Sequence, residues 1–307
     1  MIPPPPIIEI KDLVRGYDKN DAVSGLTLSV SPGRCYGFFG RNGAGKTTTI
    51  KCLLNLLRPQ GGSVRLFGLD PTRENVPIKS RLSYVPDQIP VYPWMNIQEY
   101  FKFLASFRKR WNSGMESELL NQFGLKANRK VEQLSRGERV QVALIGALCP
   151  EPELLILDEP TSGLDPIIRR EFIRTIIGTY QETDPDNRTV FVSTHLISEF
   201  EGLIDEFTII DQGKAILTAE TEAARTQFRR LRAHFRSEPP EVKSPAIVHT
   251  RVEGSELEVT VSKHFEEVKA QLAQHQPADL TEEPLTLEDI FLVNASNPGS
   301  THVIQNQ

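Results

Sequence analysis

A glycine-rich stretch near the N-terminus carries the residue types that bind phosphate groups. It lies between a short apolar run and a helical pattern, and its sequence is Gly40-Arg41-Asn42-Gly43-Ala44-Gly45-Lys46-Thr47-Thr48. In the pattern G-x-x-x-x-G-K-[ST], backbone N–H groups surround a phosphate, the lysine reaches its oxygens and the hydroxyl holds Mg²⁺. The glycines allow a close backbone approach, and the start of the following helix presents free N–H donors. The sequence therefore predicts a nucleotide-phosphate site at residues 40–48.

Two acids and a histidine follow strands that the pattern predicts to be buried. The run 154–157 is entirely apolar and precedes Asp158 and Glu159, and the run 189–193 leads to His195. Ligands of open α/β sheets bind at the carboxyl ends of the strands, so these side chains are expected beside the phosphate loop. Buried carboxylates require a cation or hydrogen-bond donors, which a magnesium nucleotide would supply. For His195 an ordinary structural role is the alternative.

Two further motifs have both a functional and a structural explanation. Ser135 precedes Glu138 by three residues, just before a helical pattern that begins near residue 139, and this is the spacing of a helix capping box. Tyr17 lies between two predicted strands, where an aromatic ring could stack on an adenine base. Its alternative is a partly buried loop tyrosine.

The chain up to about residue 218 alternates strand-like and helix-like patterns, which predicts an α/β fold. The strand, glycine-rich turn and helix in succession give the phosphate motif the structural context that it requires. Strands are expected at 7–14, 26–30, 34–39, 63–67, 81–85, 153–157, 189–193 and 207–210, the last being the final strand of the core. Helices are expected at 47–57, within the helical region 96–148, and at 167–180.

Beyond residue 218 the composition shifts toward Glu, Arg, Gln and Ala, which indicates a separate small α+β domain. A strand is expected at 229–236, a hairpin from 246–252 and 257–261, a helix at 266–275 and a short helix from 286 to 292. Disorder is expected beyond residue 294.

The composition excludes several classes of protein. The chain has 307 residues, of which 39% are hydrophobic and 24% charged, and this is ordinary for a globular protein with a sizeable core. Its formal net charge of −5 argues against a broadly basic surface, so no nucleic-acid partner is expected. No apolar run is long enough to span a membrane, and the start of the chain lacks the pattern of a secretory signal, which favours a cytoplasmic location. Three widely separated cysteines fit small buried side chains in a reducing compartment.

Taken together, these motifs in order resemble the ATP-binding-cassette ATPases, in particular the ATP-binding subunits of bacterial ABC-2 type exporters. The resemblance covers residues 7–215 closely and implies a P-loop NTPase core of the RecA-like type, an α/β fold whose mixed sheet carries an N-terminal antiparallel β part. The domains expected from it are a nucleotide-binding domain at 7–218 with a helical subdomain at about 96–150, a small C-terminal α+β accessory domain at 219–294 and a disordered tail at 295–307.

The resemblance also implies roles for the residues of the motifs. ATP would be bound by Tyr17, Gly40, Arg41, Asn42, Gly43, Ala44, Gly45, Lys46, Thr47 and Thr48. Thr47 and Asp158 would hold Mg²⁺, together with Asp87 or Gln88, between which the sequence does not decide. Glu159 would polarise the attacking water, and His195 would contact the γ-phosphate. Ser135, Gly137 and Glu138 form the signature loop, and Asp165 lies in the loop that couples two sites.

The family's architecture implies two partners. Two cassettes, identical or different, stack head to tail around two ATP molecules, so the signature loop of one protomer faces the phosphate loop of the other. A separate integral membrane subunit carries the transport path, which would place this chain on the inner face of the cell membrane. The alternative is a soluble ABC-type ATPase that acts as a conformational switch in translation or DNA repair. Arg136 and Glu138 depart from the commonest signature, Leu-Ser-Gly-Gly-Gln, and would bring a cation and an acid close to the shared phosphate.

Overall fold

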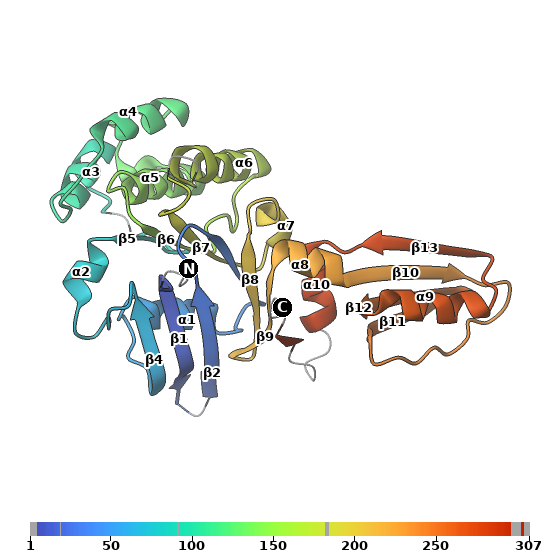
Figure 1. The fold of residues 1–307 in the computed structure, drawn as a ribbon. Helices are drawn as coiled ribbons and strands as arrows, with labels where there is room; N and C mark the ends of the chain where they lie inside the picture. The colour runs from blue at the N-terminus through green and yellow to red at the C-terminus, as the bar shows by residue number, and fades with distance from the viewer. Residues whose placement is uncertain (1–4, 19, 91, 182–183, 296–301, 304–307) are drawn as a thin grey trace.

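The computed structural model describes residues 5–18, 20–90, 92–181, 184–295 and 302–303. In Figure 1 a central sheet is flanked by a small N-terminal sheet, a group of helices and a second domain at the C-terminus. The central sheet has the strand order β14-β9-β8-β3-β7-β6-β5. Its strands are β3 (Cys35–Phe39), β5 (Leu82–Val85), β6 (Leu154–Asp158), β7 (Thr189–Thr194), β8 (Glu206–Asp211), β9 (Lys214–Glu220) and β14 (His302–Val303).

The parallel strands at the centre of this sheet position the predicted site. Strand β3 pairs in parallel with β7 on one side and with β8 on the other, and β7 pairs in parallel with β6. All residues of β3, β6 and β7 are buried, as expected of parallel strands covered on both faces. Because the three strands are neighbours, their carboxyl ends bring the phosphate loop, the two acids and His195 to the same edge.

The N-terminal part is an antiparallel sheet with the order β2-β1-β4. Its strands are β1 (Ile8–Tyr17), β2 (Asn20–Val30) and β4 (Gly61–Leu66), and helix α1 (Lys46–Leu53) packs against it. The first two strands are longer than predicted, and Tyr17 is the last residue of β1, paired with Asn20, instead of lying in a connecting segment. Helix α1 is shorter than the predicted 47–57, because the chain turns at Asn55, which has a φ of 54°.

The helical region lies over the β5–β6–β7 half of the central sheet (Figure 1). Buried residues of α5, among them Leu144, Ile145 and Leu148, belong to the same apolar core as residues of β6 and β7. Helix α5 begins at Arg136 and not at 139, because Ser135 and Glu138 form the expected capping box. The helices are α3 (Ile97–Ala105), α4 (Ser113–Gln122), α5 (Arg136–Leu148) and α6 (Pro166–Thr175), which continues as a π-helical turn, Ile176–Gln181; a short α2 (Asn75–Lys79) was not predicted.

The C-terminal domain is a four-stranded antiparallel sheet in the order β11-β12-β10-β13, with a helix on one face. Leu231, Val259, Val268 and Leu272 form the centre of its apolar core. The polar strand β13 was not predicted, since its sequence, DLTEEP, shows no apolar alternation. The elements are β10 (Phe228–His234), β11 (Ile247–Glu253), β12 (Glu256–Ser262), α9 (Phe265–Gln274) and β13 (Asp279–Pro284).

Three helices join this domain to the core, namely α7 (Ile197–Phe200), α8 (Thr221–Gln227) and α10 (Leu287–Ala295). Arg225 of α8 lies 3.1 Å from the carboxylate of Glu201, which also accepts a hydrogen bond of 2.9 Å from the Leu287 N–H. Strand β9 follows the strand that was predicted to be the last of the core, so the expected domain border at residue 218 falls inside it. Of the tail predicted to be disordered, Ala295 ends α10 and 302–303 pair with β9, while 296–301 and 304–307 lie outside the described residues.

The turn between β8 and β9 connects three parts of the fold. The Gly213 N–H donates to the Ala44 carbonyl of the phosphate loop at 3.0 Å, and the Gly213 carbonyl accepts from the Ser24 N–H of β2 at 2.9 Å. Gly213 has a φ of 77°, and a Cβ there would lie 2.8 Å from the Ala22 carbonyl oxygen. Only glycine therefore allows the phosphate loop, β2 and this turn to approach so closely.

We expect Gly213→Ala to lower the free energy of unfolding by about 2–4 kcal/mol, which combines a left-handed backbone penalty with overpacking. The matched control is Gly254→Ala, at another turn glycine with positive φ, where an added Cβ would have no atom within 4 Å. That variant should lose only about 1–2 kcal/mol. Urea denaturation of both variants measures the difference, and equal losses would contradict this account of Gly213.

Candidate active site

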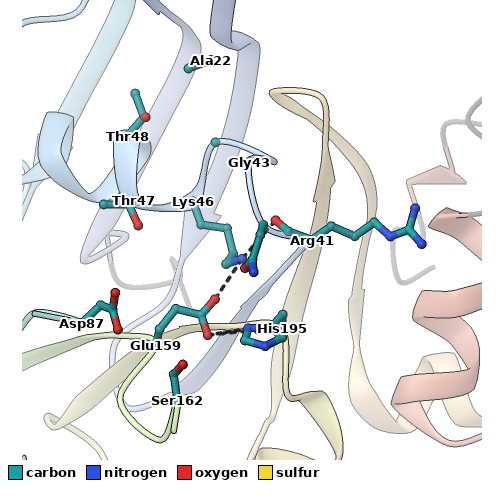
Figure 2. Close-up of a pocket in the computed structure, with 12 residues that line it drawn as sticks. Ala22, Arg41, Gly43, Lys46, Thr47, Thr48, Asp87, Glu159, Ser162 and His195 are labelled. Atoms are coloured by element: carbon teal, nitrogen blue, oxygen red, sulfur yellow. Dashed lines mark hydrogen bonds and ion pairs between the residues drawn. The ribbon is translucent and has the colours of Figure 1, made fainter.

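The phosphate loop forms one wall of a cavity of about 450 Å³ at the carboxyl edge of the central sheet (Figure 2). Its turn requires glycine at two positions, because Gly43 and Gly45 have φ values of 85° and 107°. A Cβ on Gly45 would also lie 2.3 Å from the Ala22 carbonyl oxygen of β2. Gly45 is followed directly by α1, so the free N–H groups of that helix face the cavity side of the loop.

The side chain of Lys46 is almost completely buried, with 5% of the residue exposed. Its ammonium group donates to the Gly40 carbonyl at 2.7 Å and to the Arg41 carbonyl at 3.2 Å. It also lies 3.0 Å from Oε1 of Glu159. The loop carbonyls therefore hold the cation at the centre of the cavity, where it meets the acid at the end of β6.

The Glu159 carboxylate lies between two basic side chains, as Figure 2 shows. Oε1 faces the Lys46 ammonium, and Oε2 lies 2.8 Å from Nδ1 of His195. The backbone at Glu159 is in the left-handed region, with a φ of 49°, and its N–H donates to the Ser193 carbonyl at 2.8 Å. A non-glycine residue in this region costs of order 1–3 kcal/mol and persists only where its surroundings hold it. Strand β7 supplies that restraint.

Asp158 is a buried carboxylate that is not fully compensated by the described residues. It is 1% exposed, and Oδ1 accepts a hydrogen bond of 3.1 Å from Ser193, but Oδ2 has no hydrogen-bond donor among the described residues. Burial raises the pKa of Asp158, while Thr47, Ser193 and Lys46 act in the opposite direction. An acid with an unused buried oxygen next to a threonine hydroxyl is suited to a hard cation such as Mg²⁺.

The structure brings most of the predicted residues into one cavity. Asp87 lines both this cavity and a neighbouring one, whereas Gln88 lines only the neighbouring one, together with Leu134 and Arg136. Ala22 was not predicted to line the cavity, because its methyl group gives no chemical signal. Ser162 was predicted only as the start of the loop that ends at Asp165, and the structure also places it in the cavity lining. The lining residues are Ala22, Arg41, Asn42, Gly43, Gly45, Lys46, Thr47, Thr48, Asp87, Glu159, Ser162 and His195.

Tyr17 is not one of the residues that line the cavity. The residue is 45% exposed at the end of β1, with the Arg15 guanidinium over its ring, 5.4 Å from the ring centre. Tyr17 therefore ends the middle strand of the N-terminal sheet and does not lie in a connecting loop.

The signature residues also lie outside the cavity. Ser135 is exposed at the start of α5, and its hydroxyl accepts from the Glu138 N–H at 3.2 Å. The Glu138 carboxylate forms an ion pair with Arg129, which lowers the pKa of the acid, so its charge is compensated within the chain. Gly137 is buried where α5 approaches Ile168 of α6, and a Cβ there would lie 2.6 Å from that side chain.

Comparison with known proteins agrees with this geometry. Residues 23–162 match the family model described as "ABC transporter". The bacitracin transport ATP-binding protein BcrA of Bacillus licheniformis is 37% identical over 212 residues, which cover 68% of this chain and 68% of BcrA. The chain belongs to the ABC transporter family. The predicted membership among the ATP-binding subunits is therefore confirmed, and with it the prediction that the chain is an ATPase.

Other ABC proteins match over more of the chain. The daunorubicin/doxorubicin resistance ATP-binding protein DrrA of Streptomyces peucetius is 32% identical, covering 83% of this chain and 77% of DrrA. The Nod factor export ATP-binding protein I of Paraburkholderia xenovorans is 30% identical, covering 94% of this chain and 97% of that protein.

The solved structure of an ATP-binding subunit of an ABC transporter superposes with a TM-score of 0.65 and 25% identity, covering 72% of this chain and 92% of that one. These matches confirm the predicted P-loop NTPase fold of the ABC type. Within the described ranges, no helix of this ABC subunit is long and apolar enough to cross a membrane.

We expect Asp158→Asn to stabilise the nucleotide-free protein by about 0.5–2 kcal/mol, because it removes a buried charge from a site shaped for function. The folded-state pKa of Asp158 is raised above its ordinary value of 3.8, so the charge destabilises the fold only as the pH rises past that value. Thermal unfolding without Mg²⁺ should therefore show a larger gain at pH 7 than at pH 4. A variant that is less stable than the parent at pH 7 would contradict this.

Proposed function

We propose that this chain is the ATP-hydrolysing subunit of an exporter and that it energises a separate membrane subunit through ATP-driven closure of a dimer. The observation that carries the proposal is the Lys46–Glu159–His195 cluster at the edge of the sheet, beside Asp158 and the glycine-rich loop. The names of the relatives, which include a bacitracin transport protein and a Nod factor export protein, support an exporter over a soluble ATPase.

In this proposal the phosphate loop positions the nucleotide, Asp158 binds the metal ion and Glu159 acts on the attacking water. Residues 40–48 surround the phosphates, with Lys46 as the mobile charge. Thr47 and Asp158 hold Mg²⁺, which neutralises negative charge on the phosphates when it is bound. Asp87, and not Gln88, is the side chain that we assign to the metal–water shell, because Asp87 lines the cavity.

Glu159 is assigned to orient and polarise the attacking water. Its carboxylate is held by Lys46 on one side and by His195 on the other, so its position is fixed by two charged or polar contacts. Phosphate oxygens that approach Lys46 compete with Glu159 for the same ammonium group. We infer that nucleotide binding frees one carboxylate oxygen for water while His195 keeps the other in place and contacts the γ-phosphate.

The second half of each site is assigned to another ABC ATPase subunit. Ser135 and the Gly137 N–H lie at the start of α5, outside this chain's own cavity, and would meet the γ-phosphate bound to the partner protomer. Hydrogen bonds to charged groups are worth about 1.5–3 kcal/mol each, so several that form only with ATP favour the closed dimer. Asp165 would face the partner, and Tyr17 would stack on adenine.

We assign the contact with the membrane subunit to an aromatic surface that begins a few residues after Asp87. Tyr92, Trp94, Phe103 and Phe107 form a continuous series of ring contacts with centre distances of 5.5, 5.2 and 5.1 Å. Trp94 and Phe107 are 67% and 72% exposed, and exposed aromatic clusters of this kind are enriched at protein interfaces. Contact with a cytoplasmic part of that subunit would hold the chain at the inner face of the membrane.

We expect Glu159→Gln to bind ATP as the parent does but to lower the turnover rate by about 10²–10⁴-fold, the range typical of a lost general base. ATP-bound dimers should accumulate, which sedimentation in the presence of ATP can detect. Glu153→Gln, which changes an acid immediately before the start of β6, is the control and should keep its ATPase rate. Parental turnover by the Glu159 variant would show that the role is wrongly assigned.

We expect the chain to be recovered with membranes when cells are fractionated, and to co-purify with a multi-span protein. Trp94→Ala should shift most of the chain to the soluble fraction, because loss of one central aromatic contact often costs about 2 kcal/mol or more at an interface. Leu56→Ala, at another exposed apolar residue, is the control. Recovery of the parental chain only in the soluble fraction would favour the soluble ATPase in translation or DNA repair.

A further inference from the structure

An ion pair joins the segment after His195 to the helix that follows the predicted coupling loop. Glu199 of α7 lies four residues after His195, and it pairs with Arg169 of α6. The two side chains are only 10% and 27% exposed, respectively. The pair is therefore a partly buried bridge between two elements that leave the active-site edge in different directions.

Arg169 also contacts the loop 162–165 directly. Its Nη2 donates to the Leu164 carbonyl at 3.0 Å, while Nη1 faces Glu199. Asp165, the last residue of the loop, caps α6 by accepting from the Ile167 and Ile168 N–H groups at 3.0 and 3.1 Å. One guanidinium thus fixes the loop to α7, which a lysine with its single charged nitrogen would not do in the same geometry.

The surroundings of Glu199 connect the bridge to the catalytic cluster. Burial raises the pKa of the Glu199 carboxyl, whereas Thr161, Arg169 and His195 act to lower it, and the charge of Glu159 acts to raise it. The charges of His195 and Glu159 therefore both act on the Glu199 carboxyl. Thr161, which is fully buried, lies between Glu159 and the loop in the sequence.

We propose that Arg169 and Glu199 are positioning residues that hold the 162–165 loop and the His195 segment as one unit. This inference rests on the proposed function, in which His195 contacts the nucleotide of its own chain and Asp165 faces the partner protomer. Through the bridge, the position of His195 determines the position of the 162–165 loop, which faces the nucleotide site shared with the partner protomer. Neither residue lines the cavity, so the bridge acts on the rate of turnover and leaves nucleotide binding unchanged.

If the ion pair had only a structural role, its loss would change ATP binding and turnover in a different pattern. Replacing a whole buried ion pair by apolar side chains is often neutral for stability, so burial alone gives no reason for this pair. If Arg169 and Glu199 served only the fold, their loss would reduce the folded fraction, and ATP binding and turnover would fall together. A selective loss of kcat at constant nucleotide affinity separates the two roles.

The test compares Arg169→Gln, Glu199→Gln and the double variant in the full chain. Each single variant should lower kcat by about 10- to 100-fold, the size expected of a misplacement of about 1 Å, with the Kd for ATP within about twofold of the parent. The double variant should be no slower than the slower single variant, because both substitutions break the same bridge. Arg225→Gln, which breaks the Arg225–Glu201 pair of neighbouring α7 and α8, is the matched control and should keep kcat within about twofold.

Hydrogen exchange gives a readout that does not depend on turnover. Amides of the 162–165 loop should exchange about tenfold faster in Glu199→Gln than in the parent. Arg169→Lys keeps the positive charge but loses the paired N–H donors of the guanidinium, so its loop exchange should be intermediate. Unchanged exchange and unchanged kcat in these variants would overturn the proposal. A parental chain that hydrolyses no ATP would instead contradict the proposed function, while faster loop exchange would still support the bridge.

Discussion

The structure depends on the contact between the Glu159 carboxylate and the Lys46 ammonium, because it joins the end of β6 to the loop that follows β3. Strand β7 lies between these two strands and presents His195 to the second carboxylate oxygen of Glu159. The parallel order of these three strands is therefore the constraint that makes the site. Two further contacts restrain the loop: Ala22 of the N-terminal sheet packs against Gly45, and Gly213 of the β8–β9 turn donates to the Ala44 carbonyl.

The site also contains two features that are expected to cost stability. Asp158 is a buried acid with an unused oxygen, and Glu159 adopts a backbone conformation that non-glycine residues avoid. Such strain persists only where the surroundings are rigid, and the buried strands β3, β6 and β7 provide that rigidity. Removing one partner of a buried ion pair costs about 3–5 kcal/mol, so a ligand that replaces Glu159 at Lys46 must offer comparable charge.

The sequence predicted those parts of the site whose residue types and spacing are dictated by chemistry. The glycine-rich loop, the acids after an apolar strand and His195 at the next strand end all lie where parallel-strand geometry requires them. It did not predict the contacts that depend on tertiary packing, such as Gly213 against the phosphate loop or Arg169 with Glu199. Strand β13 was not predicted, because a polar edge strand shows no apolar alternation. The end of α1 was predicted too late, because the helix ends without the Gly or Pro that usually marks a helix end. The sequence also placed Tyr17 between two strands, whereas it ends β1, since the pairing of β1 with β2 extends beyond their apolar residues.

In the proposed mechanism the site is shared, because Ser135 of one chain completes the cavity of another. The direct measurement is thiol cross-linking between two separately purified proteins, one carrying Ser135→Cys and the other Arg41→Cys, both with Glu159→Gln. The three native cysteines are buried, so the introduced pair should react selectively. We predict an ATP-dependent product containing both chains. Equal cross-linking with and without ATP, or no product although each variant binds ATP, would contradict a site shared between two copies of this chain.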